Sequence, residues 1–183
     1  MLVCCTGGEE GDLNNSALAE PGQPFHGLDA DAAKQLLATL RPHELAESAR
    51  IIGFSAVEML GYRDSGMAGE PTNDAPDCFA RADEAEAAVR LAGILTDERA
   101  DVLVIYDDHG GYGHPDHIQV HRVGVRAAEL AGTPHVYEAT IDRDHLIDVI
   151  RKTARKMSTR ALEAVALIPL GDAEQQLLAD ALG

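Results

Sequence analysis

The feature that most constrains the fold is an apolar segment followed by a run rich in glycine and histidine. The apolar segment is VLVIY at 102–106, and the run is DDHGGYGHPDHIQVH at 107–121. A short β-branched segment that ends in acids and glycines is typical of a buried parallel strand. Pro115 suits the first turn of a helix, where its missing N–H leaves no hydrogen bond unmade. We therefore predict a strand, a glycine loop and a helix that ends at Gly132.

Three histidines lie at the predicted start of that helix. His114 is at its mouth, and His117 and His121 are four residues apart, so they share a face. Ligands bind beyond the carboxyl ends of the strands in open α/β sheets, and this loop leaves such an end. We therefore interpret His114 and His117 as part of a metal or acid–base site. His121 is better explained as a solvated helix residue, because a lone helical histidine is a weak signal.

Alternating strand and helix signals extend this pattern along the chain. The predicted strands are 2–6, 57–61, 101–106, 135–140 and 165–170, and the predicted helices are 29–52, 84–95, 115–131, 144–156 and 172–182. Pro42 can break the first helix, and residues 68–80 are expected to form a long surface loop. The order favours a layered, Rossmann-like α/β fold with a mainly parallel sheet flanked by helices.

Length and charge limit the classes of function. The 183 residues are enough for one domain with a core and do not require two. With 31 acidic and 15 basic residues the formal charge is −16, which argues against nucleic acid and anionic membrane surfaces as partners. The three cysteines lack metal-ligand spacing, and no apolar run reaches membrane-spanning length. Without a recognisable signal peptide, we expect a single-domain cytoplasmic protein.

Three short blocks occur in order along the chain. They read GGEEGD at 7–12, RDSGM at 63–67 and YDxxGGYGHPDH at 106–117. Together they resemble the LmbE-like, or PIG-L, zinc-dependent de-N-acetylases, and the resemblance covers residues 1–132. Three ordered blocks are far more specific than one motif. They look closest to the actinobacterial branch that acts on N-acetylglucosaminyl-inositol and mycothiol conjugates, which implies a metal-dependent hydrolase that removes an acyl group from a small amino-sugar conjugate.

The resemblance also implies roles for residues of the third block. His117 would bind the catalytic Zn²⁺, and His114 would stabilise the tetrahedral intermediate or donate a proton to the leaving amine. Tyr112 would assist at the oxyanion from a mobile loop over the site. Asp116 would orient a catalytic histidine, because a carboxylate hydrogen-bonded to an imidazole raises its basicity.

Three further positions would contact the polar substrate according to the resemblance: Asp12, Arg41 and Asp64. Asp12 stands where relatives usually have Glu, which shortens the reach of that carboxylate by one methylene. Arg41 can equally be a surface helix residue. Asp64 can equally be a turn residue that hydrogen-bonds its own backbone.

The resemblance implies a further motif that this sequence does not show. In the family, a first strand ends in His-Pro-Asp-Asp, which supplies two metal ligands and the general base and lies upstream of the block that matches residues 2–12. We expect the domain over 1–183 to be N-terminally incomplete and to lack that strand. A catalytic zinc normally has three protein ligands, so we expect impaired or absent activity. The exposed sheet edge would favour self-association into homo-oligomers.

Three hypotheses about function follow from these observations. The first is an N-deacetylase or amidase for an amino-sugar conjugate, whose start codon was assigned too late. The second is a non-catalytic remnant that binds a sugar-like ligand or a partner protein through Asp12, Arg41, Asp64 and His114. The third is a different metal site, suited to a phosphoesterase, formed by His114, His117 and His121.

Overall fold

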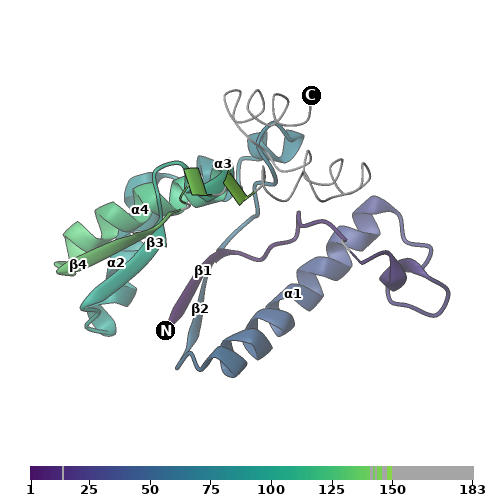
Figure 1. The fold of residues 1–183 in the computed structure, drawn as a ribbon, viewed down its shortest axis with the longest axis horizontal. Coiled ribbons are helices and arrows are strands. Elements are labelled where there is room, and N and C mark those ends of the chain that lie inside the picture. Colours follow the sequence, from purple (N-terminus) through teal and green to yellow (C-terminus); the bar gives the residue numbers. More distant parts are fainter. Residues whose placement is uncertain (14, 141, 143, 146–147, 150–183) are drawn as a thin grey trace.

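The computed structural model describes residues 1–13, 15–140, 142, 144–145 and 148–149 (Figure 1). Its strands are β1 (Leu2–Thr6), β2 (Val57–Tyr62), β3 (Val102–Tyr106) and β4 (His135–Ala139). Its α-helices are α1 (Ala30–Ile52), α2 (Glu84–Asp97), α3 (Gly110–Gly113) and α4 (Pro115–Ala131), and its short 3-10 helices are Ser16–Ala19, Pro71–Asp74 and Phe79–Arg81. The predicted strand 165–170 and helix 172–182, and most of the predicted helix 144–156, lie outside the described residues.

The described strands form two parallel pairs (Figure 1). β1 pairs with β2, with Leu2 opposite Val57, and β3 pairs with β4, with Val102 opposite His135. Each pair is a βαβ unit, because α1 connects β1 to β2 while α3 and α4 connect β3 to β4. The predicted α/β fold of parallel strands flanked by helices is confirmed. Within the described residues its strands are divided between two sheets rather than joined in one.

The core lies where α2 packs on α4 (Figure 1). Small and apolar side chains of both helices are fully buried there: Ala87, Ala88, Val123 and Ala127. Ala88, Leu91 and Leu95 of α2 are buried along one face of the helix, in agreement with their helical spacing. Small residues let the backbones of α2 and α4 approach closely, and α4 also packs against β3, whose carboxyl end leads into the site.

The loop at 68–80 is largely exposed, as predicted, but its end is anchored in the core at Cys78 and Phe79. Phe79 is fully buried and belongs to the core cluster. The backbone of Arg63 bonds to this segment twice: its N–H donates to the Asp77 carbonyl at 3.3 Å, and its carbonyl accepts from the Phe79 N–H at 2.9 Å. The aromatic side chain was the signal against a solvated loop, because a Phe side chain favours burial by about 1.5–3 kcal/mol.

Helix α1 is continuous through Pro42, so the predicted break at this residue is wrong. Asp29 caps its start by accepting from the Ala32 N–H, and Gly53 ends it in the left-handed conformation. Ala49 is its only buried residue, so water can satisfy the carbonyl that a proline leaves without a donor. Neither α1 nor any other described helix is long and apolar enough to cross a membrane.

Candidate active site at the start of helix α4

His114 is the N-cap of helix α4, and Pro115 follows in the first helical position, as predicted. The backbone N–H of Asp116 donates to Nδ1 of His114 at 3.2 Å. A backbone amide can only donate, so Nδ1 carries its lone pair and the neutral ring has its proton on Nε2. His114 therefore offers an N–H donor to a group that binds beyond the N-terminus of the helix.

His117 has the opposite arrangement of its ring nitrogens. Its Nδ1 lies 3.2 Å from the carbonyl oxygen of Gly110, which can only accept, so Nδ1 carries the proton and Nε2 has a free lone pair. Burial and the nearby His114 hold the pKa of His117 below its usual value, which favours the neutral ring. Gly110 has φ 64°, and a Cβ there would lie 2.9 Å from Cβ of His117, so only glycine brings this carbonyl so close.

Two tyrosines surround the His117 ring. Tyr106, the last residue of β3, stacks on it with ring centroids 3.8 Å apart and planes 5° apart. Tyr112 of α3 approaches it edge-on at 5.1 Å and also faces His114 at 6.1 Å. Tyr112 lies between two glycines with positive φ and is exposed. From the edge of the two imidazoles, its side chain could reach a bound ligand.

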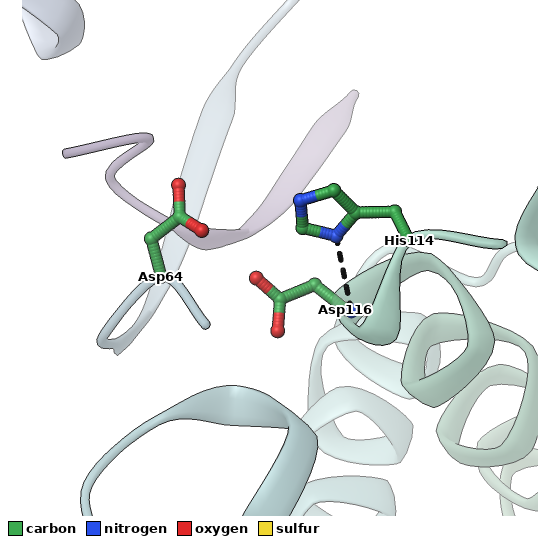
Figure 2. A group of neighbouring side chains, drawn as sticks. All are labelled: Asp64, His114 and Asp116. Atoms are coloured by element: carbon green, nitrogen blue, oxygen red, sulfur yellow. Dashed lines mark hydrogen bonds between the residues drawn. The ribbon is translucent and has the colours of Figure 1, made fainter. Parts of the chain in front are cut away.

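Asp64, His114 and Asp116 converge at the N-terminal end of α4 (Figure 2). Asp64 comes from the loop after β2, whereas the other two come from the start of α4, and one nitrogen or oxygen atom of each lies within 4.8 Å of the others. Oδ1 of Asp64 also accepts from the Gly66 N–H at 2.9 Å, so the turn role expected as an alternative is present. Asp64 therefore closes its own turn and belongs to the group of polar side chains.

The carboxylate of Asp116 is buried and is held by Ser65. Its Oδ2 accepts from the Ser65 N–H at 3.1 Å, and its Oδ1 accepts from the Ser65 hydroxyl. Burial raises the pKa of Asp116 and the negative charge of Asp64 adds to this, while the hydrogen bonds from Ser65 oppose the rise. The contact from Asp116 to His114 runs through the backbone amide, so the role predicted for the carboxylate stays a prediction.

Ser65 was missed in the sequence, although it lies beside Asp64 in the RDSGM block. It is fully buried, and its hydroxyl also accepts from the Ala80 N–H at 3.0 Å. Its carbonyl accepts from the side chains of Thr72 at 2.9 Å and Asn73 at 2.6 Å. Ser65 therefore ties the segment between β2 and α2 to the start of α4. A serine beside a predicted site residue in a recognisable block was the available signal.

Glu9 and Glu10 were also missed, and both support the residues around Asp64. Oε1 of Glu9 accepts from the backbone N–H of Asp64 at 3.0 Å. The Glu10 side chain is 1% exposed and forms ion pairs with Lys34 and, at 2.9 Å, with Arg63. Burial alone would raise the pKa of Glu10, but the hydrogen bonds from Lys34 and Arg63 hold it below its usual value.

Arg41 lies against the loop at residues 7–12, which contains Asp12. A Cβ added to Gly8 would be 3.2 Å from Nε of Arg41, and one added to Gly11 would be 3.5 Å from its terminal nitrogen. Both Arg41 and Asp12 are exposed. The structure therefore brings these two predicted substrate-binding residues to one loop, and it does not place them in the group formed by Asp64, His114 and Asp116.

His121 is hydrogen-bonded rather than solvated. Its Nδ1 lies 3.2 Å from the carbonyl oxygen of Tyr106 and 3.4 Å from a carboxylate oxygen of Glu138. Two candidate metal groups occur among the described residues: Asp64 with His114 and Asp116, and Asp107 with Asp108 and His109. Neither group includes His121 or His117. This position gives His121 a structural contact to β3 and lends no support to a three-histidine metal site.

The hydrogen bonds at the site indicate that His117 suits a divalent metal, whereas His114 and Asp116 suit a polar ligand. His117 fits a metal, because a metal-binding imidazole commonly donates its other N–H to a backbone carbonyl. His114 fits less well, because its Nδ1 is occupied and its Nε2 carries the proton. Both oxygens of Asp116 already accept hydrogen bonds. The group around His114 is therefore better suited to hydrogen bonding than to coordination.

The chain is similar to several deacetylases. Residues 1–128 match the family described as PIG-L: GlcNAc-PI de-N-acetylase. A Catenulispora acidiphila protein named 1D-myo-inositol 2-acetamido-2-deoxy-alpha-D-glucopyranoside deacetylase 1 is 49% identical over 137 residues, which are 73% of this chain and 40% of the relative. Deacetylase 2 of the same organism is 41% identical over 179 residues, which are 92% of this chain and 56% of the relative.

A third relative, from Thermomonospora curvata, carries the same deacetylase name without a number. It is 47% identical over 137 residues, which are 73% of this chain and 43% of the relative. The chain therefore spans about half the length of the curated relatives it matches. The shared part includes the histidine loop and the start of α4, since the family match extends to residue 128.

Proposed function

The chain belongs to the PIG-L family, and on that premise we propose that it carries part of the active site of a metal-dependent N-deacetylase. The reaction would remove an acyl group from the amine of an amino-sugar conjugate, in line with the names of the relatives. One observation of the geometry carries the proposal. His114 and His117 lie with ring centroids 4.8 Å apart, and one offers an N–H donor while the other offers a free lone pair.

His117 is the residue that would hold the metal, which we propose to be Zn²⁺. When bound, a divalent ion polarises the acyl carbonyl and lowers the pKa of a water molecule. Nδ1 of His117 donates to the Gly110 carbonyl, which leaves Nε2 as the coordinating atom. A catalytic zinc usually has three protein ligands, so His117 needs partners in addition to the residues described around it.

His114 would stabilise the negative charge that develops on the acyl oxygen. Its Nε2–H is the donor, because Nδ1 is occupied by the backbone N–H of Asp116. One such donor is worth about 3–4 kcal/mol of transition-state stabilisation in enzymes that cleave acyl bonds. The occupied Nδ1 favours this role over proton donation, since an imidazolium would direct two N–H groups against each other. Tyr112 would assist from the edge of the site.

Asp64 and Arg41 would bind the hydroxyl groups of the sugar conjugate. Asp64 is directed into the space beside His114 (Figure 2). Arg41 lies over the loop that contains Asp12. Carboxylate oxygens accept from hydroxyl groups and a guanidinium donates to them, so each of these two side chains complements a polyhydroxylated ligand. A small amino-sugar conjugate carries both an acylated amine and such hydroxyl groups.

A second candidate function is a ligand-binding remnant without catalysis. The group formed by Asp64, His114 and Asp116 favours it, because hydrogen bonds within the protein already orient each of these side chains. Such a protein would bind the sugar conjugate and release no amine. The two functions make different predictions. The deacetylase needs His117 for Zn²⁺ binding and for amine release, whereas the remnant releases no amine.

Two measurements test this proposal. One is the release of amine from an N-acetylated glucosaminyl-inositol, and the other is the zinc content of the purified protein, determined by mass spectrometry. We expect His117→Ala to lose zinc and amine release, and His121→Ala to keep both within about threefold, since its contact is structural. Loss of zinc in His121→Ala with full retention in His117→Ala would overturn the proposed ligand. Binding of the sugar by calorimetry with no amine release, with or without added Zn²⁺, would instead establish the remnant.

A further inference from the structure

The stack of Tyr106 on His117 brings an aromatic ring from β3 onto an imidazole from α4. The ring centroids are 3.8 Å apart and the planes are within 5°, so the two rings lie face to face. Tyr106 is the residue that ends β3, and His117 lies in the first turn of α4. The contact therefore joins the carboxyl end of a strand to the helix start that carries the site.

The position of Tyr106 is itself fixed by contacts on two elements. Its backbone pairs with Ala139 in the β3–β4 ladder. Its carbonyl lies 3.2 Å from Nδ1 of His121, one turn further along α4 than His117. The backbone of Tyr106 is therefore held by both β4 and α4, which fixes the position from which its ring extends over His117.

A single hydrogen bond does not determine the orientation of an imidazole. The bond from Nδ1 of His117 to the Gly110 carbonyl restrains χ2, the rotation about Cβ–Cγ that turns the ring plane. One bond of 3.2 Å still tolerates a range of χ2 values, because this terminal sp³–sp² torsion is broad. A flat aromatic face at 3.8 Å narrows this range, because turning the imidazole about χ2 would drive one of its edges into the Tyr106 ring. The hydrogen bond and the stack together leave one direction for Nε2.

We propose that Tyr106 is a positioning residue for His117, whose ring plane it fixes so that Nε2 keeps one direction. The inference rests on the proposed function, in which Nε2 of His117 coordinates the metal and therefore needs a fixed direction. Tyr106 acts through its aromatic face, not through its hydroxyl group.

The first test follows His117 by NMR in the 183-residue chain with ¹⁵N-labelled histidine. His117→Gln assigns its signals. We expect one set of signals from the tautomer with the proton on Nδ1, ring protons shifted upfield by Tyr106, and cross-relaxation between the two rings. Tyr106→Phe should keep this pattern, whereas Tyr106→Leu should remove the upfield shift and mix the tautomers. Tyr137→Leu, on the exposed neighbouring strand β4, is the matched control and should change nothing.

The second test measures Zn²⁺ affinity by competition with a chromophoric chelator. Loss of a group that orients a ligand typically lowers metal affinity 10–100-fold, and we expect this loss for Tyr106→Leu. Tyr106→Phe and Tyr137→Leu should stay within about threefold of the parent chain. A Phe variant as weak as the Leu variant would show that the hydroxyl group matters and would overturn the proposal.

The two proposals fail in different ways. Unchanged His117 signals in Tyr106→Leu, or no cross-relaxation between the rings in the parent chain, would overturn the role of Tyr106 whatever the enzyme does. If the chain neither binds Zn²⁺ nor releases amine, the proposed function is overturned. The His117 NMR signals would then still show whether Tyr106 fixes the imidazole. If Tyr106→Leu does not fold, as judged by circular dichroism, cross-relaxation in the parent chain still tests whether the Tyr106 and His117 rings are stacked.

Discussion

Ser65 and Asp116 lie 51 positions apart in the chain and are joined by two hydrogen bonds. The backbone N–H and the hydroxyl of Ser65 donate to the two carboxylate oxygens of Asp116, and both residues are buried. This pair connects the segment after β2 to the start of α4. It therefore holds Asp64, the residue before Ser65, beside His114.

Replacement of Ser65 by alanine should destabilise the protein and disturb the site. The variant loses the hydroxyl that donates to Asp116 and accepts from the Ala80 N–H, so a buried carboxylate oxygen and a backbone N–H lose their partner. We expect a loss of about 2–4 kcal/mol in the free energy of unfolding, measured with urea. Ser55→Ala, at an exposed position, should change this free energy by less than about 0.5 kcal/mol. Equal stability of the two variants would contradict the importance of the Ser65–Asp116 pair.

Two helical glycines should respond to alanine with opposite signs. A Cβ on Gly124 of α4 would lie 2.6 Å from Cγ2 of Ile105, whereas a Cβ on Gly93 of α2 would meet nothing within 4 Å. We expect Gly124→Ala to cost about 1–3 kcal/mol, because it separates α4 from β3. Gly93→Ala should stabilise by about 0.5–1 kcal/mol, since alanine is the better helix former. Thermal unfolding by calorimetry measures both, and a stabilised Gly124→Ala would refute the close packing of α4 on β3.

Tyr62→Phe should leave stability unchanged or raise it. The Tyr62 hydroxyl is buried and has no hydrogen-bond partner among the described residues. Its ring packs on Phe79 with centroids 5.1 Å apart and faces the guanidinium of Arg90 at 5.0 Å, and phenylalanine keeps both contacts. We expect a gain of between zero and about 1 kcal/mol in urea unfolding. A loss above about 1 kcal/mol would mean that the hydroxyl has a partner.

Asp107 should make stability depend on acid pH. Hydrogen bonds from the Gly111 N–H and the Thr140 hydroxyl hold the pKa of Asp107 below its usual value. A lowered pKa in the folded state contributes stability above the unfolded pKa of about 3.9, and this contribution is lost as pH falls through the folded value. We therefore expect Asp107→Asn to cost about 1–2 kcal/mol at pH 7.

The stability difference between the parent chain and Asp107→Asn should stay constant from about pH 7 to pH 5 and shrink below about pH 4. Urea unfolding at a series of pH values measures it. Asp101→Asn, at an exposed position just before β3, is the control and should differ little from the parent at any pH. A difference that grows as pH falls would show that the pKa of Asp107 is raised on folding.

Local signals predicted the elements that build the site. The apolar β-branched segment forms the parallel strand β3, but Val102 and Val104 are exposed, so the expected burial of this strand is wrong for them. Pro115 and Gly132 mark the two ends of α4 as expected. His114 at the mouth of the helix and His117 in its first turn followed from these boundaries. Such predictions succeed because strand preference, the first helical position and a left-handed glycine depend on a few neighbouring residues.

Pro42 and Phe79 show where local signals were insufficient. The helix continues through Pro42, and the predicted surface loop contributes Phe79 to the core. Both outcomes depend on what surrounds the segment, because solvent can satisfy a free carbonyl and a core can bury a ring. Neither environment is visible in the neighbouring residues.

The sequence by itself determined the family, the α/β class and the helix start that carries His114 and His117. Only the tertiary structure decided which nitrogen of each imidazole is free, that Tyr106 covers His117, and that Ser65 holds Asp116. The orientation of a side chain in the site depends on partners tens of residues away. Those partners meet only when α2 packs on α4 and the segment after β2 folds against them.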